Sequence, residues 1–208
     1  MPSEAERLHV CLTQETPWGV VYNEGGQVVQ VMADQLRALP QAEGARLVSG
    51  AIARARTGFQ FLYHFYPMLS AYQAGRDPGL YLHSVLERIN AEPFLAFVRQ
   101  VTGIPTLVRA DAQATLYAPG HFLTRHDDSP NVNLNRRVAY VLSMTRNWHP
   151  DYGALLQFYD DANAVTDVFV PRFNTLSLFT VPQMHAVTYT APFAPVGRFA
   201  ITGWFQDP

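Results

Sequence analysis

The chain contains no lysine, and this absence removes several classes of chemistry. All 15 of its basic residues are arginine. A protein without lysine forms no pyridoxal aldimine and no Schiff-base aldolase intermediate. It also has no Walker-type phosphate lysine and no Ser-x-x-Lys nucleophile pair. The sequence therefore excludes these enzyme classes, whatever the origin of the preference for arginine.

Cysteine and charge are also scarce. The single cysteine, Cys11, allows no disulfide within the chain, no cysteine-rich zinc site and no CxxC redox pair. Any metal site must therefore use histidine, aspartate or glutamate. Charged residues make up 15% of the chain and the formal net charge is −2. This balance disfavours a nucleic-acid partner, because contact with a phosphate backbone needs a basic surface.

Long apolar runs are missing as well. A membrane-spanning helix needs roughly 20 predominantly apolar residues, and no segment of the chain approaches this length. The first residues, MPSEAERLHVCLTQ, carry early acidic residues and no unbroken apolar core, so they do not form a targeting signal. We therefore predict a soluble, cytoplasmic protein without a membrane partner. The sequence leaves the oligomeric state open.

The two halves of the chain have different patterns, and the change falls near Gly103-Ile104-Pro105. Before it, hydrophobic spacing predicts helices over 28–39 and over 80–101, where a second helix opens at Glu92-Pro93. The alanine- and arginine-rich composition of 42–56 predicts another helix. The aromatic stretch 58–67 is predicted to be extended. With 208 residues, 48% of them hydrophobic, the chain suits one domain. We predict a single domain over 1–208, in which a mostly helical layer (1–104) supports a core (105–208).

After Pro105 helical periodicity gives way to short segments rich in β-branched and aromatic residues, separated by proline, glycine and asparagine turns. The pattern predicts strands at 107–118, 122–127, 137–144, 154–159, 165–170, 175–179, 186–190 and 198–205. About eight antiparallel strands in roughly 100 residues are typical of a jelly roll or a small barrel. We therefore predict an α+β chain with a mainly β core, on one sheet of which the N-terminal helices pack.

His126 and Asp128 form the most informative pair of residues. Side chains two residues apart on a strand point to the same face, so these two can converge. A facial triad of two imidazoles and one carboxylate leaves other coordination positions open and suits non-haem Fe(II). His185 stands at the start of another predicted strand, which a folded jelly roll could bring opposite the pair. Arg198 opens the last strand, and a guanidinium inside a barrel needs an anion.

Several motifs follow one another in a fixed order over roughly 116–205: Tyr117-Ala-Pro-Gly120, His126-x-Asp128, Arg137-Val138, Trp148, Tyr152-Gly153, His185, Arg198 and Ile201-Thr-Gly-Trp-Phe205. This order resembles the prolyl 4-hydroxylase-like branch of the iron(II)/2-oxoglutarate dioxygenases. The resemblance implies a double-stranded β-helix. It also implies hydroxylation of a C–H bond with Fe(II), 2-oxoglutarate and O2, with release of succinate and CO2 and with ascorbate as a possible addition.

The resemblance further implies roles for individual residues. Fe(II) would be bound by His126, Asp128 and His185, and the distal carboxylate of 2-oxoglutarate would pair with Arg198. The co-substrate pocket would also include Tyr117, Thr202 and Ser143, the last standing where related prolyl hydroxylases often carry a second tyrosine. This departure predicts a wider or wetter pocket. Candidate substrate-binding residues are Arg125, Arg136 and Trp204, and Tyr63, Tyr66 and the loop 67–79 are candidates for a lid.

The substrate and the class of activity have alternatives. A prolyl residue in a protein or peptide is the first hypothesis, because the motif order is closest to that branch. A free amino acid or another small metabolite is the second. The same jelly roll could also serve a zinc or manganese hydrolase or isomerase, or a non-catalytic binding module. Arg198, Trp148 and Gly153 argue against a zinc or manganese enzyme, and the intact triad argues against a non-catalytic binding module.

Overall fold

The computed structural model describes residues 3–128 and 135–208. Its helices are α1 (Glu4–Val10), a π-helical turn (Cys11–Glu15), α2 (Ala33–Ala38), α3 (Gln41–Arg54), α4 (Met68–Gln73), α5 (Tyr81–Ile89), α6 (Glu92–Thr102) and a 3-10 turn (Pro150–Tyr152). Its strands are β1 (Gly19–Glu24), β2 (Gln27–Val31), β3 (Phe61–Tyr66), β4 (Arg109–Ala110), β5 (Gln113–Tyr117), β6 (Phe122–His126), β7 (Arg136–Ser143), β8 (Leu156–Tyr159), β9 (Val165–Phe169), β10 (Thr175–Thr180), β11 (His185–Val187) and β12 (Arg198–Gln206).

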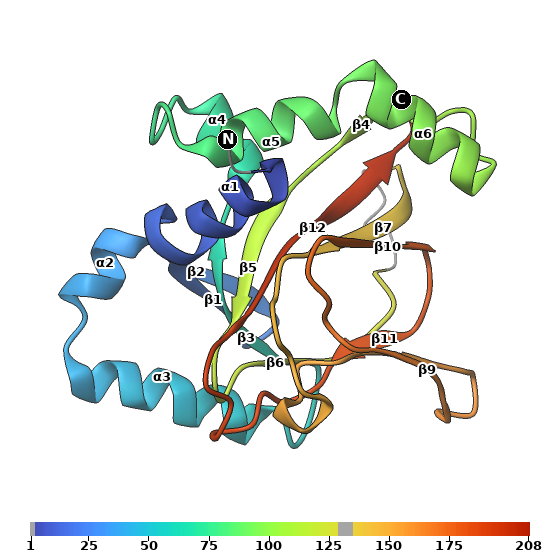
Figure 1. Cartoon of the computed structure of the whole chain (residues 1–208). Coiled ribbons are helices and arrows are strands. Elements are labelled where there is room, and N and C mark those ends of the chain that lie inside the picture. Colours follow the sequence, from blue (N-terminus) through green and yellow to red (C-terminus); the bar gives the residue numbers. More distant parts are fainter. Residues whose placement is uncertain (1–2, 129–134) are drawn as a thin grey trace.

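The strands form one curled antiparallel sheet with the order β10-β7-β12-β5-β3-β6-β11-β8-β9. Figure 1 shows the sheet bending round on itself, with α4, α5 and α6 across its upper end and α3 at the lower end. This is the jelly roll that the strand-rich half predicts, and each segment predicted as a strand after Pro105 overlaps an observed strand. No helix in the described part of the chain is long and apolar enough to cross a membrane.

Two of the predicted helical regions are confirmed. The segment 42–56 corresponds to α3, and 80–101 contains α5 and α6. Proline in the first turn of α6 opens it, and Gly103 ends it in the left-handed conformation (φ 70°) that glycine adopts without steric cost. The sequence therefore marks both ends of this helix.

The prediction of one helix over 28–39 is wrong. Residues 27–31 form β2, which pairs with β1, and only 33–38 are helical. Gly25 and Gly26 both have positive φ (61° and 83°) and form the two-residue turn between the strands, as a type I′ hairpin requires. Three of the five residues of β2 are valine, and β-branched side chains favour a strand over a helix.

The first half of the chain also supplies a central strand of the sheet. The aromatic stretch predicted to be extended contains β3, which pairs with both β5 and β6. Residues before Gly103 therefore contribute β1, β2 and β3 to the sheet as well as the helices that cover it. Two side chains of β3, Phe61 and Tyr63, line the interior cavity, whereas Leu62 and Tyr66 belong to buried clusters outside it.

Strand β12 divides its side chains between the helical core and the interior of the barrel. Ile201 and Phe205 are fully buried in the cluster formed with α1, α4, α5 and α6. Arg198, Thr202 and Trp204 line the cavity on the other side. This alternation is the period of two expected of a strand. The packing of Ile201 and Phe205 against the helices therefore also determines where the cavity-lining residues of β12 lie.

Two neighbouring histidines predict a dependence of stability on pH. The rings of His64 and His121 lie 4.8 Å apart, and the backbone N–H of Ala118 donates to Nδ1 of His121. Burial, and then the nearby His64, lower the pKa of His121 to about 4, and burial also lowers the pKa of His64. Both rings are therefore neutral in the folded protein at pH values where the unfolded chain takes up protons.

The free energy of unfolding should accordingly fall as pH decreases from about 6.5 to about 4, since the unfolded state binds more protons there. His121 alone contributes up to about 1.4 kcal/mol per pH unit. Urea unfolding at pH 7, 6 and 5 measures the slope. His121→Asn should make it shallower, whereas the exposed His149→Asn serves as control. An unchanged slope in His121→Asn contradicts the prediction.

Candidate metal centre

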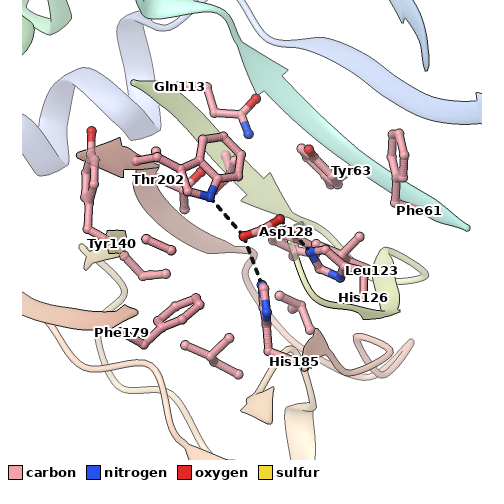
Figure 2. Close-up of a pocket in the computed structure, with 18 of the residues that line it drawn as sticks. Phe61, Tyr63, Gln113, Leu123, His126, Asp128, Tyr140, Phe179, His185 and Thr202 are labelled. Atoms are coloured by element: carbon pink, nitrogen blue, oxygen red, sulfur yellow. Dashed lines mark hydrogen bonds and ion pairs between the residues drawn. The ribbon is translucent and has the colours of Figure 1, made fainter. Parts of the chain in front are cut away.

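His126, Asp128 and His185 come together at one point of the sheet. His126 is the last residue of β6 and His185 the first of β11, and the two are direct partners in the antiparallel register. Their Nε2 atoms lie 3.2 Å and 3.5 Å from the two carboxylate oxygens of Asp128, as Figure 2 shows. The ligand atoms of the three residues all lie within 4.8 Å of one another, so that they could hold a metal ion.

The route by which these residues converge differs from the simple alternation expected of a strand. Between His126 and Leu123 the register of β6 against β11 shifts by one residue, and such a bulge re-aims the bulged strand. Leu123 and His126 consequently both line the cavity. Asp128 lies beyond the end of β6 in the left-handed conformation (φ 55°), which aspartate tolerates better than most residues.

Backbone carbonyls fix the orientation of both imidazoles. The Nδ1 atom of His126 lies 3.0 Å from the carbonyl oxygen of Thr124, and that of His185 lies 2.7 Å from the carbonyl oxygen of Gln183. A carbonyl only accepts hydrogen bonds, so each Nδ1 carries the proton. Each Nε2 therefore faces Asp128, and it offers a lone pair to a metal ion when the ring is neutral.

The charge state of the group suits a divalent cation. Burial, and then the nearby His126, lower the pKa of His185. Burial acts to raise the pKa of the Asp128 carboxyl, but hydrogen bonding to His126 and the proximity of His185 outweigh it, and the pKa lies below its ordinary value. One carboxylate and two imidazole nitrogens are the donors that non-haem iron takes in a facial triad.

A cavity of about 530 Å³ opens beside these three residues. Its walls are largely aromatic and aliphatic, and include Phe59, Phe61, Tyr63, Leu123, Leu156 and Phe179. Figure 2 shows Phe179 on the His185 side of Asp128 and Phe61 and Tyr63 on the opposite side. His126, Asp128 and His185 thus face a cavity that also has polar lining residues, among them Arg136 and Arg198.

Arg198 lines the same cavity and is almost completely buried, with 3% of its surface exposed. Its Nε and Nη1 atoms have no hydrogen-bond partner among the described residues. Burial lowers the pKa of its guanidinium. Leaving a charged group buried and unpaired is costly, so the arrangement fits an anion that enters the cavity and accepts from both nitrogens.

Two of the three other residues predicted for the co-substrate pocket, Tyr117 and Thr202, line the same cavity as Arg198. The Tyr117 ring lies 5.4 Å from its guanidinium carbon, and Thr202 also lines the cavity. Ser143 is buried but is not among the cavity-lining residues. It pairs in register with Ala200, and its Oγ has no hydrogen-bond partner within the described part of the chain. Because Ser143 lies outside the cavity lining, its contact with the co-substrate stays a prediction.

The sequence analysis did not single out Gln113, and it placed Tyr63 in a lid and not in the wall of the cavity. Gln113, Thr115 and Tyr117 are alternate residues of β5, and all three line the cavity. Strand alternation from Tyr117 could therefore have predicted the position of Gln113. Tyr63 on β3 stacks on Tyr117 with centroids 5.0 Å apart. Burial raises the pKa of Tyr63 to about 12, which keeps its hydroxyl protonated as a donor.

The structure separates the three candidate substrate-binding residues. Arg136 and Trp204 line the cavity, with the Arg136 guanidinium carbon 3.6 Å from the Trp204 ring centroid. The Nε of Arg136 is buried and has no partner among the described residues. Arg125 instead is exposed and borders a second hollow, of about 380 Å³, together with Tyr159 and Tyr189. The bulge in β6 accounts for this outward direction.

The proposed lid is not formed by Tyr66. Its ring is buried among the helices, and its hydroxyl donates to Asp77. Residues 68–73 of the predicted loop form α4, whose Met68 and Ala71 belong to the same buried cluster. Tyr66 and this helix are therefore parts of the core and do not cover the cavity.

Comparison with known proteins agrees with the site and the fold. Residues 112–206 match the sequence model of the 2OG-Fe(II) oxygenase superfamily. Prolyl 3-hydroxylase OGFOD1 of Mus musculus is 28% identical over 132 residues, which cover 60% of this chain and 24% of that protein. The chain thus spans about a quarter of the length of this relative.

Solved structures show the same fold. A Pseudomonas putida prolyl-4-hydroxylase is similar over 98% of both chains, with a TM-score of 0.53 and 18% identity. A Trichoplax adhaerens prolyl hydroxylase, solved with a hypoxia inducible factor oxygen degradation domain peptide fragment, has a TM-score of 0.54 and 17% identity over 98% of this chain and 91% of that one. The sequence match over 112–206, the jelly roll and the His/Asp/His group together make this chain similar to the 2OG-Fe(II) oxygenases.

Proposed function

We propose that this chain is a 2OG-Fe(II) oxygenase that hydroxylates a prolyl residue in a protein or peptide and converts 2-oxoglutarate to succinate and CO2. The observation that carries the proposal is the buried, unpaired guanidinium of Arg198 in the same cavity as the His126, Asp128 and His185 group. Three residues that could hold a metal ion and a guanidinium that could bind an anion thus line the same cavity. The prolyl substrate is supported by the similarity to OGFOD1, which is named a prolyl 3-hydroxylase.

The residues present fit the groups that the family requires. Fe(II) would be bound by His126, Asp128 and His185 through two neutral imidazoles and one carboxylate. With 2-oxoglutarate and O2, bound iron supplies the oxidising chemistry that places one oxygen atom in succinate and the other in the substrate hydroxyl. Arg198 would pair through two donors with the distal carboxylate, Tyr117 would donate from its protonated hydroxyl, and Thr202 would border the same end.

The remaining space suits a small apolar side chain. Phe61, Leu123 and Phe179 border the cavity near the metal ligands, and they would exclude water and fit the ring of a proline. Arg136, which has a buried Nε without a partner in the described chain, would donate to a substrate carbonyl, beside the ring of Trp204. Arg125 lies away from the cavity, so the substrate contact proposed here rests on Arg136.

A first experiment tests the co-substrate chemistry without a substrate. Protein loaded with Fe(II) under anaerobic conditions should develop a visible charge-transfer band when 2-oxoglutarate is added. Bound iron without this band would favour a metal protein of another kind.

A second experiment tests the substrate. Proline-containing peptide libraries, incubated with Fe(II), 2-oxoglutarate, O2 and ascorbate to keep the iron reduced, should gain one oxygen atom by mass spectrometry. The gain should disappear when 2-oxoglutarate is omitted. Oxygen incorporation into free amino acids or other small metabolites alone would move the substrate class away from peptides.

A further inference from the structure

The indole of Trp204 contacts the carboxylate of Asp128. Its Nε1–H donates to Oδ2 over 3.0 Å. The same Oδ2 lies 3.5 Å from Nε2 of His185, and Oδ1 lies 3.2 Å from Nε2 of His126. Both oxygens of Asp128 therefore face the imidazoles, and either or both could reach an ion held between the rings (Figure 2).

We propose that Trp204 is a positioning residue that keeps Asp128 a one-oxygen ligand. The inference rests on the proposed function. Oδ2 accepts the indole N–H and is therefore directed toward the indole. This leaves Oδ1 to coordinate the metal ion. A facial site of three residues leaves three coordination positions open only if its carboxylate occupies a single position. Two of these are needed for a chelating 2-oxo acid and one for O2, so a second carboxylate oxygen would compete with the co-substrate.

The position of the indole is itself fixed from two directions. The Arg136 guanidinium lies over the ring, and the backbone N–H of Trp204 donates to Oδ1 of Asp111 over 2.8 Å. Gln206 donates to the other oxygen of Asp111 over 3.2 Å. A side chain at Gly203 would not fit, because its Cβ would lie 2.2 Å from the carbonyl oxygen of Asp111. The N–H is therefore held in a defined direction.

The chain provides a matched control for this hydrogen bond. It has three tryptophans, and the indoles of Trp18 and Trp148 donate to the backbone carbonyls of Leu12 and Gly153. Only Trp204 donates to a carboxylate of the metal-ligand group. Trp148→Phe and Trp204→Phe thus each remove one indole N–H donor, but only the second change alters the surroundings of Asp128.

The test measures ligand binding and a spectrum as well as turnover. With Trp204→Phe, the protein should still bind Co(II) or Fe(II), because its three ligands remain. The affinity of the metal-loaded protein for 2-oxoglutarate, measured by anaerobic titration calorimetry, should fall about tenfold, a loss of the size that removal of an outer hydrogen-bond partner causes in metal affinity or activity. The visible spectrum of the Co(II)-loaded protein should change. Trp148→Phe should leave both the affinity and the spectrum unchanged.

The outcomes separate the inference from the function on which it depends. If the unmodified protein binds Fe(II) but not 2-oxoglutarate, the proposed function fails. If the unmodified protein binds both and Trp204→Phe matches it in affinity and spectrum, the positioning role alone is overturned. Equal changes in Trp204→Phe and Trp148→Phe would also overturn it. If Trp204→Phe folds poorly, benzothienylalanine at position 204 keeps the ring shape and removes only the N–H, with the same expected result.

Discussion

Replacing Arg198 with methionine should weaken 2-oxoglutarate binding about 100-fold while stabilising the ligand-free protein. Loss of two charge-assisted hydrogen bonds removes roughly 3 kcal/mol of binding free energy. Without ligand, however, Arg198 is buried, and two of its nitrogens have no partner in the described residues. Exchange of a buried charge for an apolar side chain of similar size stabilises by roughly 1–4 kcal/mol in favourable cases.

Two measurements on the same variant check these opposite effects. Anaerobic calorimetry with Fe(II)-loaded protein gives the affinity for 2-oxoglutarate, and urea unfolding of the metal-free protein gives the stability. Arg137→Met is the control, because Arg137 is exposed and pairs with Asp207. Unchanged binding in Arg198→Met would disprove the role of Arg198. A loss of stability in the ligand-free state would mean that its guanidinium has a partner within the protein.

Replacing His126 or His185 with alanine should abolish both metal binding and turnover. Each change removes one of three ligands from a group whose ligand atoms lie within 4.8 Å of one another. In the unmodified protein, metal at 100 times its dissociation constant adds about 2.7 kcal/mol to the free energy of unfolding. That increment should vanish in both variants, whereas the exposed His149→Ala should keep it.

Thermal unfolding with and without Fe(II) measures the increment, and anaerobic metal titration measures binding directly. Persistence of tight binding in both histidine variants would place the metal elsewhere in the chain. Loss of turnover with unchanged metal binding would assign these histidines to a different step. Read together with Arg198→Met, the result also separates an oxygenase from a hydrolase that uses the same three ligands, because a hydrolase has no need of Arg198.

The strands after Pro105 could be predicted because each is short, rich in β-branched or aromatic residues and bounded by turn residues. The region 28–39 misled the prediction, since its hydrophobic spacing also fits one helical face. The residues that distinguish a strand from a helix here stand just before the segment 28–39. Gly25-Gly26 supplies two positive φ angles and forms the turn of a hairpin. Local turn chemistry here outweighed periodicity.

The part of the candidate site that consists of residues close in sequence, or in a recognisable order of motifs, could be predicted from the sequence. His126, Asp128, His185 and Arg198 could be grouped in this way, and the structure brings the first three together. Tyr63 could not be placed, because its position depends on the pairing of β3 with β5 and β6. The outward direction of Arg125 depends on a bulge that only the register against β11 shows.

The place of β12 in the sheet has a consequence for how the protein folds. This strand comes last among the described strands, yet it lies between β7 and β5 and pairs with both. The chain must therefore close loops from Arg198–Gln206 back to residues near 113 and 140 before the sheet is continuous. High contact order of this kind slows folding and leaves strand edges unprotected during synthesis. We expect the edges that β5 and β7 present to β12 to stay unpaired until these last strand residues have left the ribosome.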